Sequence, residues 1–173
     1  MPVIRCTTKL LAAIDDLPVA TPADASSPIG DWYGHLFTVE RRKAILFISE
    51  RTLFVCLALG VTKSDYRRIV PFFLDLLTRT LGQEGFNEEK TDWLLSLHKN
   101  MAIGRTHNRS TLGSLNNRIG DAKYLIEYDG GLDHCDVPAL VHRLNETPMG
   151  PIKYSNGLVQ MKRMAAIGMG TRD

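Results

Sequence analysis

Three closely spaced apolar runs between Trp32 and Leu59 constrain the fold of this chain most strongly. The runs read WYGHLFTV, KAILFIS and TLFVCLAL, and all are rich in aromatic and β-branched residues. Polar turns at 40–42 and 50–51 separate them, and connections this short join antiparallel strands. Nearly continuous hydrophobicity in the second and third runs indicates a central position with at least one face covered by helices. The sequence therefore predicts an antiparallel β-meander.

Short strands and amphipathic helices are predicted on both sides of the meander. Val3–Cys6 is expected to be a strand, and Thr62–Asp65 resembles a capping box at the start of a helix. Pro71 should kink that helix or divide it in two. Asn87 is expected to cap the next helix, and Met101–Ile103 to form a last strand. The predicted fold class is α+β, an antiparallel β-meander of about four to five strands packed against four to five α-helices.

Length and composition indicate one cytoplasmic domain that covers residues 1–173. Three cysteines at wide spacing, without a CxxC pair, favour reduced thiols. No apolar run approaches the roughly 20 residues needed to span a bilayer, and the start of the chain does not resemble a signal peptide. A mobile loop rich in proline, serine and alanine is expected at 15–30, and a frayed tail from about residue 155.

The stretch Gly104–Ile126 is the candidate functional site. Its second half places Leu112, Leu115, Ile119, Ala122 and Ile126 at helical spacing, which predicts an amphipathic helix. Asn108 or Ser110 is expected to cap this helix. Unpaired N–H groups and the positive end of the helix dipole can attract an anion. Arg105, His107 and Arg109 would add donors beside it.

Two glycines inside the same helix also require an explanation. Gly113 and Gly120 are seven residues apart and lie on nearly the same side, with Asn116 and Asn117 between them. Glycine costs about 1 kcal/mol relative to alanine inside a helix. The usual reason is close packing of another element, and the alternative is a strip that faces a ligand.

The predicted ligand-binding set combines this stretch with the turn between the first two long strands: Arg105, His107, Asn108, Arg109, Ser110, Asn116, Asn117, Arg41 and Arg42. Net charge is only +2, so a basic footprint would have to be local. His134, Cys135 and Asp136 are adjacent in a turn and lack partners at a ligand spacing, so no metal site and no cofactor are predicted. The interpretation here is a turn that leads to an Asp136 helix cap.

Several motifs together resemble an uncharacterised bacterial domain family of unknown function. They read IRCTTKLL, GDWYGHLF, ERRKAILF, TLF and NRSTLGSLN, and the similarity runs from Ile4 to about Met149. The resemblance implies a stand-alone cytoplasmic α+β domain and no established activity, cofactor or catalytic residue. The segment 118–121 departs from the more continuous apolar helix expected there.

The residues favour a binding module that grips a polyanion, either nucleic acid or a nucleotide, at the polar helix start 105–117. One alternative is a small phosphodiesterase or ribonuclease that uses His107 for proton transfer, Arg109 to brace the phosphate and Ser110 as a further candidate catalytic residue. The absence of an evident second acid or base favours the module. A second alternative is a protein–protein interaction domain. No membrane contact is expected, and the oligomeric state is open.

Overall fold

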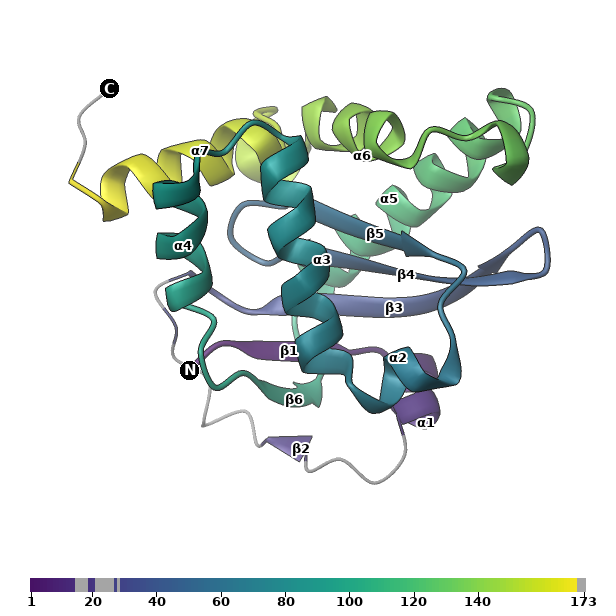
Figure 1. Ribbon diagram of the computed structural model, residues 1–173, viewed down its shortest axis with the longest axis horizontal. Helices are drawn as coiled ribbons and strands as arrows, with labels where there is room; N and C mark the ends of the chain where they lie inside the picture. Colours follow the sequence, from purple (N-terminus) through teal and green to yellow (C-terminus); the bar gives the residue numbers. More distant parts are fainter. Residues whose placement is uncertain (15–18, 21–26, 28, 171–173) are drawn as a thin grey trace.

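The computed structural model describes residues 1–14, 19–20, 27 and 29–170. In this part of the chain, six strands form one mixed sheet in the order β2-β6-β1-β3-β4-β5. Helices cover both of its faces (Figure 1). The strands are β1 Val3–Cys6, β2 Val19–Ala20, β3 Trp32–Val39, β4 Arg42–Ser49, β5 Val55–Leu59 and β6 Ala102–Arg105. This arrangement confirms the α+β class.

The predicted meander is confirmed as β3, β4 and β5, which pair in antiparallel fashion. The expectation of an antiparallel sheet is nevertheless wrong for the other half. β1 pairs in parallel with both β3 and β6, and β2 pairs in parallel with β6. Long connections that contain helices join these strands, and parallel pairing requires such crossovers. The two-residue strand β2 also lies inside the segment predicted as a loop at 15–30, most of which falls outside the described residues.

One helical layer packs against the face of the sheet that carries Ile4, Trp32, Phe47 and Cys56. It is drawn in front of the sheet in Figure 1. The helices are α1 Thr8–Ile14, α2 Lys63–Arg67, α3 Ile69–Gln83, α4 Glu88–Ser96 and α7 Gly157–Gly168. Gly34 of β3 faces this layer, where an added Cβ would lie 3.0 Å from both Leu10 and Phe47. Close approach of α1 to the sheet therefore requires glycine at this position.

The second layer consists of α5, Arg109–Tyr128, and α6, Val137–Glu146. The predicted stripe packs on β3 and β4, with Leu115, Ile119, Ala122 and Ile126 buried and Leu112 partly buried. Short 3-10 turns, η2 Leu132–His134 and η3 Gly150–Ile152, flank α6. Every residue of β4 from Ala44 to Ser49 is buried, because the strand is central and covered on both faces. This confirms the predicted position of the second apolar run.

Most helix boundaries follow the predicted local signals. Asn87 caps α4, Asn108 caps α5, and Asp136 caps α6, as expected. The chain breaks between α2 and α3 at Arg68, three residues before Pro71, so the division into a short and a longer helix is confirmed. In the tail that was expected to fray from about residue 155, Gly157–Gly168 forms α7, whose apolar face is buried in the core. Residues 171–173 lie outside the described part.

Candidate functional site

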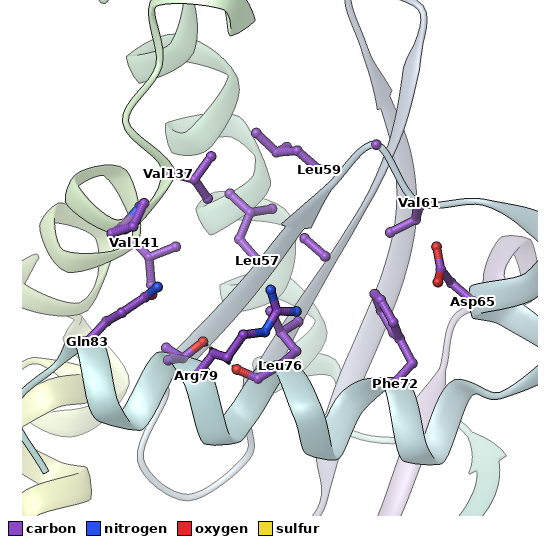
Figure 2. Close-up of a pocket in the computed structure, with 14 residues that line it drawn as sticks. Leu57, Leu59, Val61, Asp65, Phe72, Leu76, Arg79, Gln83, Val137 and Val141 are labelled. Carbon is purple, nitrogen blue, oxygen red and sulfur yellow. Dashed lines mark hydrogen bonds between the residues drawn. The ribbon is translucent and has the colours of Figure 1, made fainter.

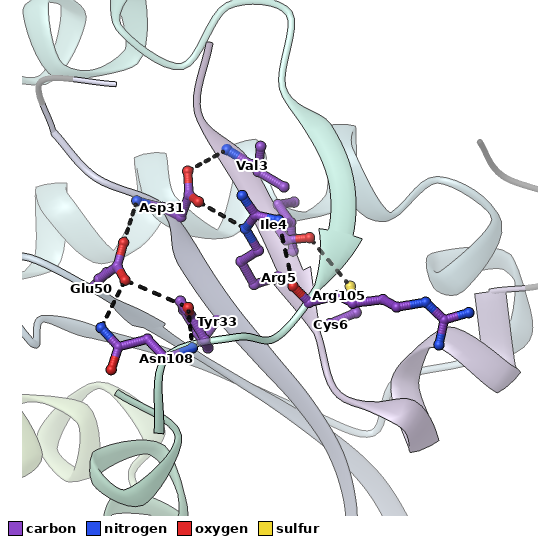
Figure 3. Close-up of polar contacts among 9 residues, drawn as sticks. All are labelled: Val3, Ile4, Arg5, Cys6, Asp31, Tyr33, Glu50, Arg105 and Asn108. Carbon is purple, nitrogen blue, oxygen red and sulfur yellow. Dashed lines mark hydrogen bonds and ion pairs between the residues drawn. The ribbon is translucent and has the colours of Figure 1, made fainter. Parts of the chain in front are cut away.

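The start of α5 is held in place by a polar network over the sheet (Figure 3). The Oδ1 atom of Asn108 accepts the backbone N–H groups of Ser110 and Thr111, at 3.0 and 3.2 Å. Its Nδ2 atom donates to Glu50 at 3.0 Å, and its own backbone N–H donates to the hydroxyl of Tyr33 at 3.2 Å. The cap therefore already uses two of the unpaired N–H groups on which the anion hypothesis depends.

A buried ion pair lies next to this network. The Nε atom of Arg5 is 2.8 Å from Oδ2 of Asp31, and the two side chains are 1% and 5% exposed. The other carboxylate oxygen accepts the backbone N–H of Val3 at 3.0 Å, while Nη1 of Arg5 donates to the carbonyl of Arg105 at 3.5 Å. This pair ties β1 to the entry of β3 and to the end of β6. Sequence analysis missed it because its two members are 26 positions apart.

The predicted cationic side chains lie at the surface. Arg105, His107 and Arg109 are all exposed, and none forms an ion pair with another described residue. The ring of His107 lies edge-on to Tyr33, with 6.2 Å between ring centroids. The side chain of Arg105 extends away from Asn108 (Figure 3). None of these three side chains lines the cavities that are described below.

Tyr33, whose ring contacts His107, is buried. Burial raises the pKa of its hydroxyl, and the charge of Glu50 adds to the increase. The hydroxyl therefore stays protonated near neutral pH and can donate to the Glu50 carboxylate, 3.5 Å away. A carboxylate at this position also lowers the positive potential at the start of α5, which disfavours a polyanion there.

The solvent face of α5 carries the predicted amides and glycines. Asn116 and Asn117 are exposed, and a Cβ added at Gly113 or Gly120 would meet no described atom within 4 Å. Close packing by another element, the usual explanation, is therefore wrong here. A strip that faces a ligand stays a prediction. Further along the same face the exposed rings of Tyr124 and Tyr128 stack, with 6.3 Å between centroids.

Arg41 and Arg42 lie far from this helix start. In the same hairpin, Glu40 accepts the backbone N–H of Leu132 at 2.7 Å, just beyond the end of α5. Arg42 lies 3.7 Å from Asp133 in an exposed ion pair. A helix of 20 residues spans roughly 30 Å. The structure thus places the hairpin and the start of α5 at opposite ends of α5 and does not bring the two predicted groups together.

The segment 118–121, where a more continuous apolar helix was expected, contains a buried arginine. Arg118 is buried, and its Nη2 atom forms an ion pair with Asp121 at 2.8 Å. Its Nη1 atom donates to the carbonyl of Leu144 at 3.4 Å, so this arginine joins α5 to the end of α6. A polar contact between helices therefore replaces the expected apolar one.

A different site lies at the edge of the sheet, on β5. Each antiparallel strand directs alternate N–H and C=O groups to its partner and the others outward. The N–H of Ser49 donates to the carbonyl of Phe54 at 2.9 Å, so Phe54 faces β4. By alternation Val55, Leu57 and Leu59 direct their backbone groups away from the sheet. Because β5 is the last strand in the order, no further strand of the described residues receives them.

The outward groups of Val55 are paired by a side chain rather than by a strand. Its N–H donates to Oδ1 of Asn145 at 2.8 Å, and its carbonyl accepts from Nδ2 of Asn145 at 3.1 Å. An amide side chain carries a carbonyl acceptor and an NH2 group with two donor hydrogens, so it can pair with the N–H and the carbonyl of one residue. Asn145, from α6, therefore takes the place that one residue of a neighbouring strand would occupy.

Beyond Asn145 the edge of β5 lines a groove of about 330 Å³ between α3 and α6 (Figure 2). Leu57 and Leu59 lie along its floor. The α3 wall includes Phe72, Leu76 and Arg79, and the α6 wall includes Val137 and Val141. Arg79 extends from α3 toward β5 and is exposed. Among the described residues it has no ion-pair partner, whereas Asp65 at the other end accepts the N–H of Thr62 at 2.7 Å.

A chain of polar contacts closes the groove at the Asn145 end. Nδ2 of Asn145 also donates to Glu84 at 3.2 Å, and the other oxygen of Glu84 accepts from Nδ1 of His142 at 2.7 Å. The hydrogen bond to Glu84 is the main reason that the pKa of His142 is raised above its ordinary value. Glu84 is buried, so this network holds Asn145 against Val55 from within the core.

The remaining reactive side chains have structural roles. Burial raises the pKa of both the Cys6 and the Cys56 thiol to about 12, which keeps them protonated and unreactive near neutral pH. Asp136 accepts the N–H of Ala139 at 3.2 Å, which confirms the cap interpretation of the 134–136 turn. None of the described helices is both long and apolar enough to cross a bilayer.

Comparison with known protein families assigns the chain to one of them. It belongs to DUF6933, a domain of unknown function, whose family model matches residues 3–157. This match confirms the resemblance to an uncharacterised domain family and covers both the start of α5 and the β5 groove. No curated protein matches the sequence.

Sequence analysis did not identify the β5 groove. The third apolar run was correctly predicted as a strand, but strand order cannot be read from one sequence. A weak signal was present in Asn145, a polar residue on the apolar face of the helix that contains Leu140, Val141 and Leu144. A polar residue on such a face requires a buried partner.

Proposed function

We propose that this domain is a protein-interaction module that binds an extended peptide segment along the outer edge of β5. The outward backbone groups of Leu57 and Leu59, at the floor of a groove between two helices, are the observation that supports this proposal. A peptide that adds a strand to a sheet pairs with such groups and gains affinity from main-chain hydrogen bonds.

Spacing in the groove matches a strand. Leu57 and Leu59 are two residues apart, which corresponds to roughly 6.8 Å along an antiparallel strand. The walls from α3 and α6 are apolar where Leu76 and Val141 contribute, so they suit small apolar side chains of a bound segment. Asn145 occupies the position opposite Val55, and the added strand therefore ends there. The bound segment is short and enters from the Gly60 end.

The charged side chains at the groove favour a peptide that carries an acidic residue. Arg79 is exposed at the groove, has no ion-pair partner among the described residues, and can form a two-point contact with a carboxylate. Asp65 is already bonded to Thr62. The ligand is therefore an extended segment with at least one acidic side chain placed to meet Arg79.

Selection from a randomised decapeptide display library against the full chain tests this proposal. Enriched peptides should carry an acidic residue between small or apolar ones. Leu59→Pro removes an outward N–H without removing a hydrogen bond to β4, and proline is tolerated on edge strands. We expect it to weaken peptide binding roughly tenfold or more, since the peptide carbonyl then lacks its donor.

Leu59→Ala is the matched control, because it shortens the same side chain and retains the N–H. It should change affinity much less than the proline variant. Hydrogen exchange measured by NMR supplies a direct readout, in which the amide protons of Leu57 and Leu59 become protected in the complex. Selected peptides that bind without protecting either amide would contradict strand addition.

The polyanion-binding hypothesis remains a second candidate, in a modified form. Arg109 at the start of α5 and the stacked rings of Tyr124 and Tyr128 share the exposed side of this helix with Asn117. Stacking on exposed aromatic rings is how many proteins hold single-stranded nucleic acid. A single-stranded oligonucleotide tests this surface. Its affinity should fall in Tyr124→Ala and in Arg109→Gln, and only the arginine variant should reduce the salt dependence.

The phosphodiesterase hypothesis stays a prediction. It requires that His107→Ala abolish cleavage of a nucleic acid substrate that the unmodified protein cleaves. The ring next to His107 is Tyr33, whose raised pKa makes it a poor general base near neutral pH.

A further inference from the structure

A second cavity, of about 600 Å³, lies between α4 and α7. This volume falls within the roughly 300–1,000 Å³ typical of small-molecule sites. Its apolar lining includes Trp93 from α4, Leu97 directly after α4, and Met164 and Ile167 from α7. It shares no lining residue with the β5 groove and is independent of the peptide proposal.

The indole of Trp93 and the end of α7 shape this cavity. An added Cβ at Gly168 would collide with the six-membered ring of Trp93, so glycine allows the indole to lie directly against the helix. The neighbouring side chain of Ile167 is 79% exposed, although it lines the cavity. A large apolar side chain at the mouth of an apolar cavity gains from being covered by the body of a ligand.

Charge around the cavity has one sign. Among the described residues that line it, the charged ones are Arg51 and Arg163, and none is acidic. Arg163 is exposed on α7 and forms no ion pair with another described residue. A guanidinium group pairs well with a carboxylate in two-point fashion.

We propose that this cavity binds a small amphipathic carboxylate. Its apolar chain or ring lies between Trp93 and Met164, and its carboxylate meets Arg163 at the rim. A nucleotide fits less well, because an apolar wall leaves the hydrogen-bonding groups of a sugar unpaired. The same apolar wall favours a hydrocarbon chain, because contact between the two removes apolar surface from water.

Sodium decanoate, kept below its micelle concentration, is a suitable probe for isothermal titration calorimetry on the full chain, and decanol is its uncharged counterpart. We expect saturable binding of one decanoate with a negative heat-capacity change. Arg163→Gln should weaken decanoate binding roughly tenfold and leave decanol nearly unaffected, since a charge-assisted contact is lost. Ile167→Ser should weaken the binding of both compounds.

Arg79→Gln is the matched control, because Arg79 is also exposed on a helix but lines the other groove. It should leave decanoate binding unchanged, just as Arg163→Gln should leave peptide binding at β5 unchanged. Absence of saturable decanoate binding would overturn the proposal. An affinity that Arg163→Gln and Arg79→Gln reduce equally would also overturn it, because the attraction would then be a general effect of charge.

Discussion

Asn145→Leu is expected to destabilise the fold strongly, because the leucine side chain cannot pair with the backbone of β5. Val55 is fully buried, and both of its outward groups bond to the Asn145 amide at 2.8 and 3.1 Å. A buried backbone group that loses its partner costs about 1–3 kcal/mol. Val55 would lose the partners of two such groups, and burial of the leucine side chain would offset part of this cost. The free energy of unfolding should therefore fall by about 3–4 kcal/mol.

Urea unfolding followed by tryptophan fluorescence measures this loss directly. In thermal unfolding, each kcal/mol of lost stability lowers the Tm of a domain of this size by roughly 2–4 °C. The Tm should therefore fall by about 6–16 °C. Asn117→Leu is the control, because Asn117 is an exposed asparagine on α5, and it should change stability by about 0.5 kcal/mol at most. A loss below about 1 kcal/mol for Asn145→Leu would refute the interpretation that Asn145 substitutes for a strand.

Further substitutions test three other features of the structure. Gly113→Ala and Gly120→Ala should each stabilise the protein by about 1 kcal/mol in thermal unfolding, since an added Cβ meets only open space. A loss of stability would indicate a packing partner on that face. Arg5→Met should cost about 3–5 kcal/mol in urea unfolding, because Asp31 is left buried without its countercharge, and Asp31→Asn in the same chain should recover part of the loss. His142 has a raised pKa, so its stabilising contribution is complete below pH 6.5 and is lost as pH rises through the raised value. His142→Gln should therefore flatten the fall in stability above pH 6.5, and an unchanged pH profile would show that the histidine is not coupled to folding.

The successful predictions concern contacts between residues close in sequence. Asn87, Asn108 and Asp136 cap helices because each side chain reaches an N–H two or three positions ahead. Likewise β3, β4 and β5 form a meander because their short connections allow only antiparallel pairing. Such contacts depend on local geometry, which the sequence specifies directly.

The failures concern contacts between residues far apart. β1 and β6 are adjacent in the sheet but separated by more than half of the chain, so their parallel pairing has no local signal. The prediction that another element packs against the two glycines of α5 failed for a similar reason. Whether another element covers Gly113 depends on where every other helix packs, and no described element covers it.

The candidate site was predicted only in part. Arg105, His107 and Arg109 are exposed as expected, but Arg41 and Arg42 belong to the opposite end of α5. Proximity in space between a hairpin and a helix start follows from sheet order and helix direction. Neither the order of strands in the sheet nor the direction of a helix can be obtained from charge patterns in one sequence.

By itself, then, the sequence determined the α+β class, most helix boundaries and the family to which the chain belongs. Only the tertiary structure decided that β5 is an edge strand, that Asn145 closes one end of it, and that α3 and α6 leave a groove along the rest. The physical reason is the distance along the sequence between the residues in contact. A helix cap or a hairpin forms within a few residues, whereas the position of an open strand edge depends on how all the strands of the sheet pair.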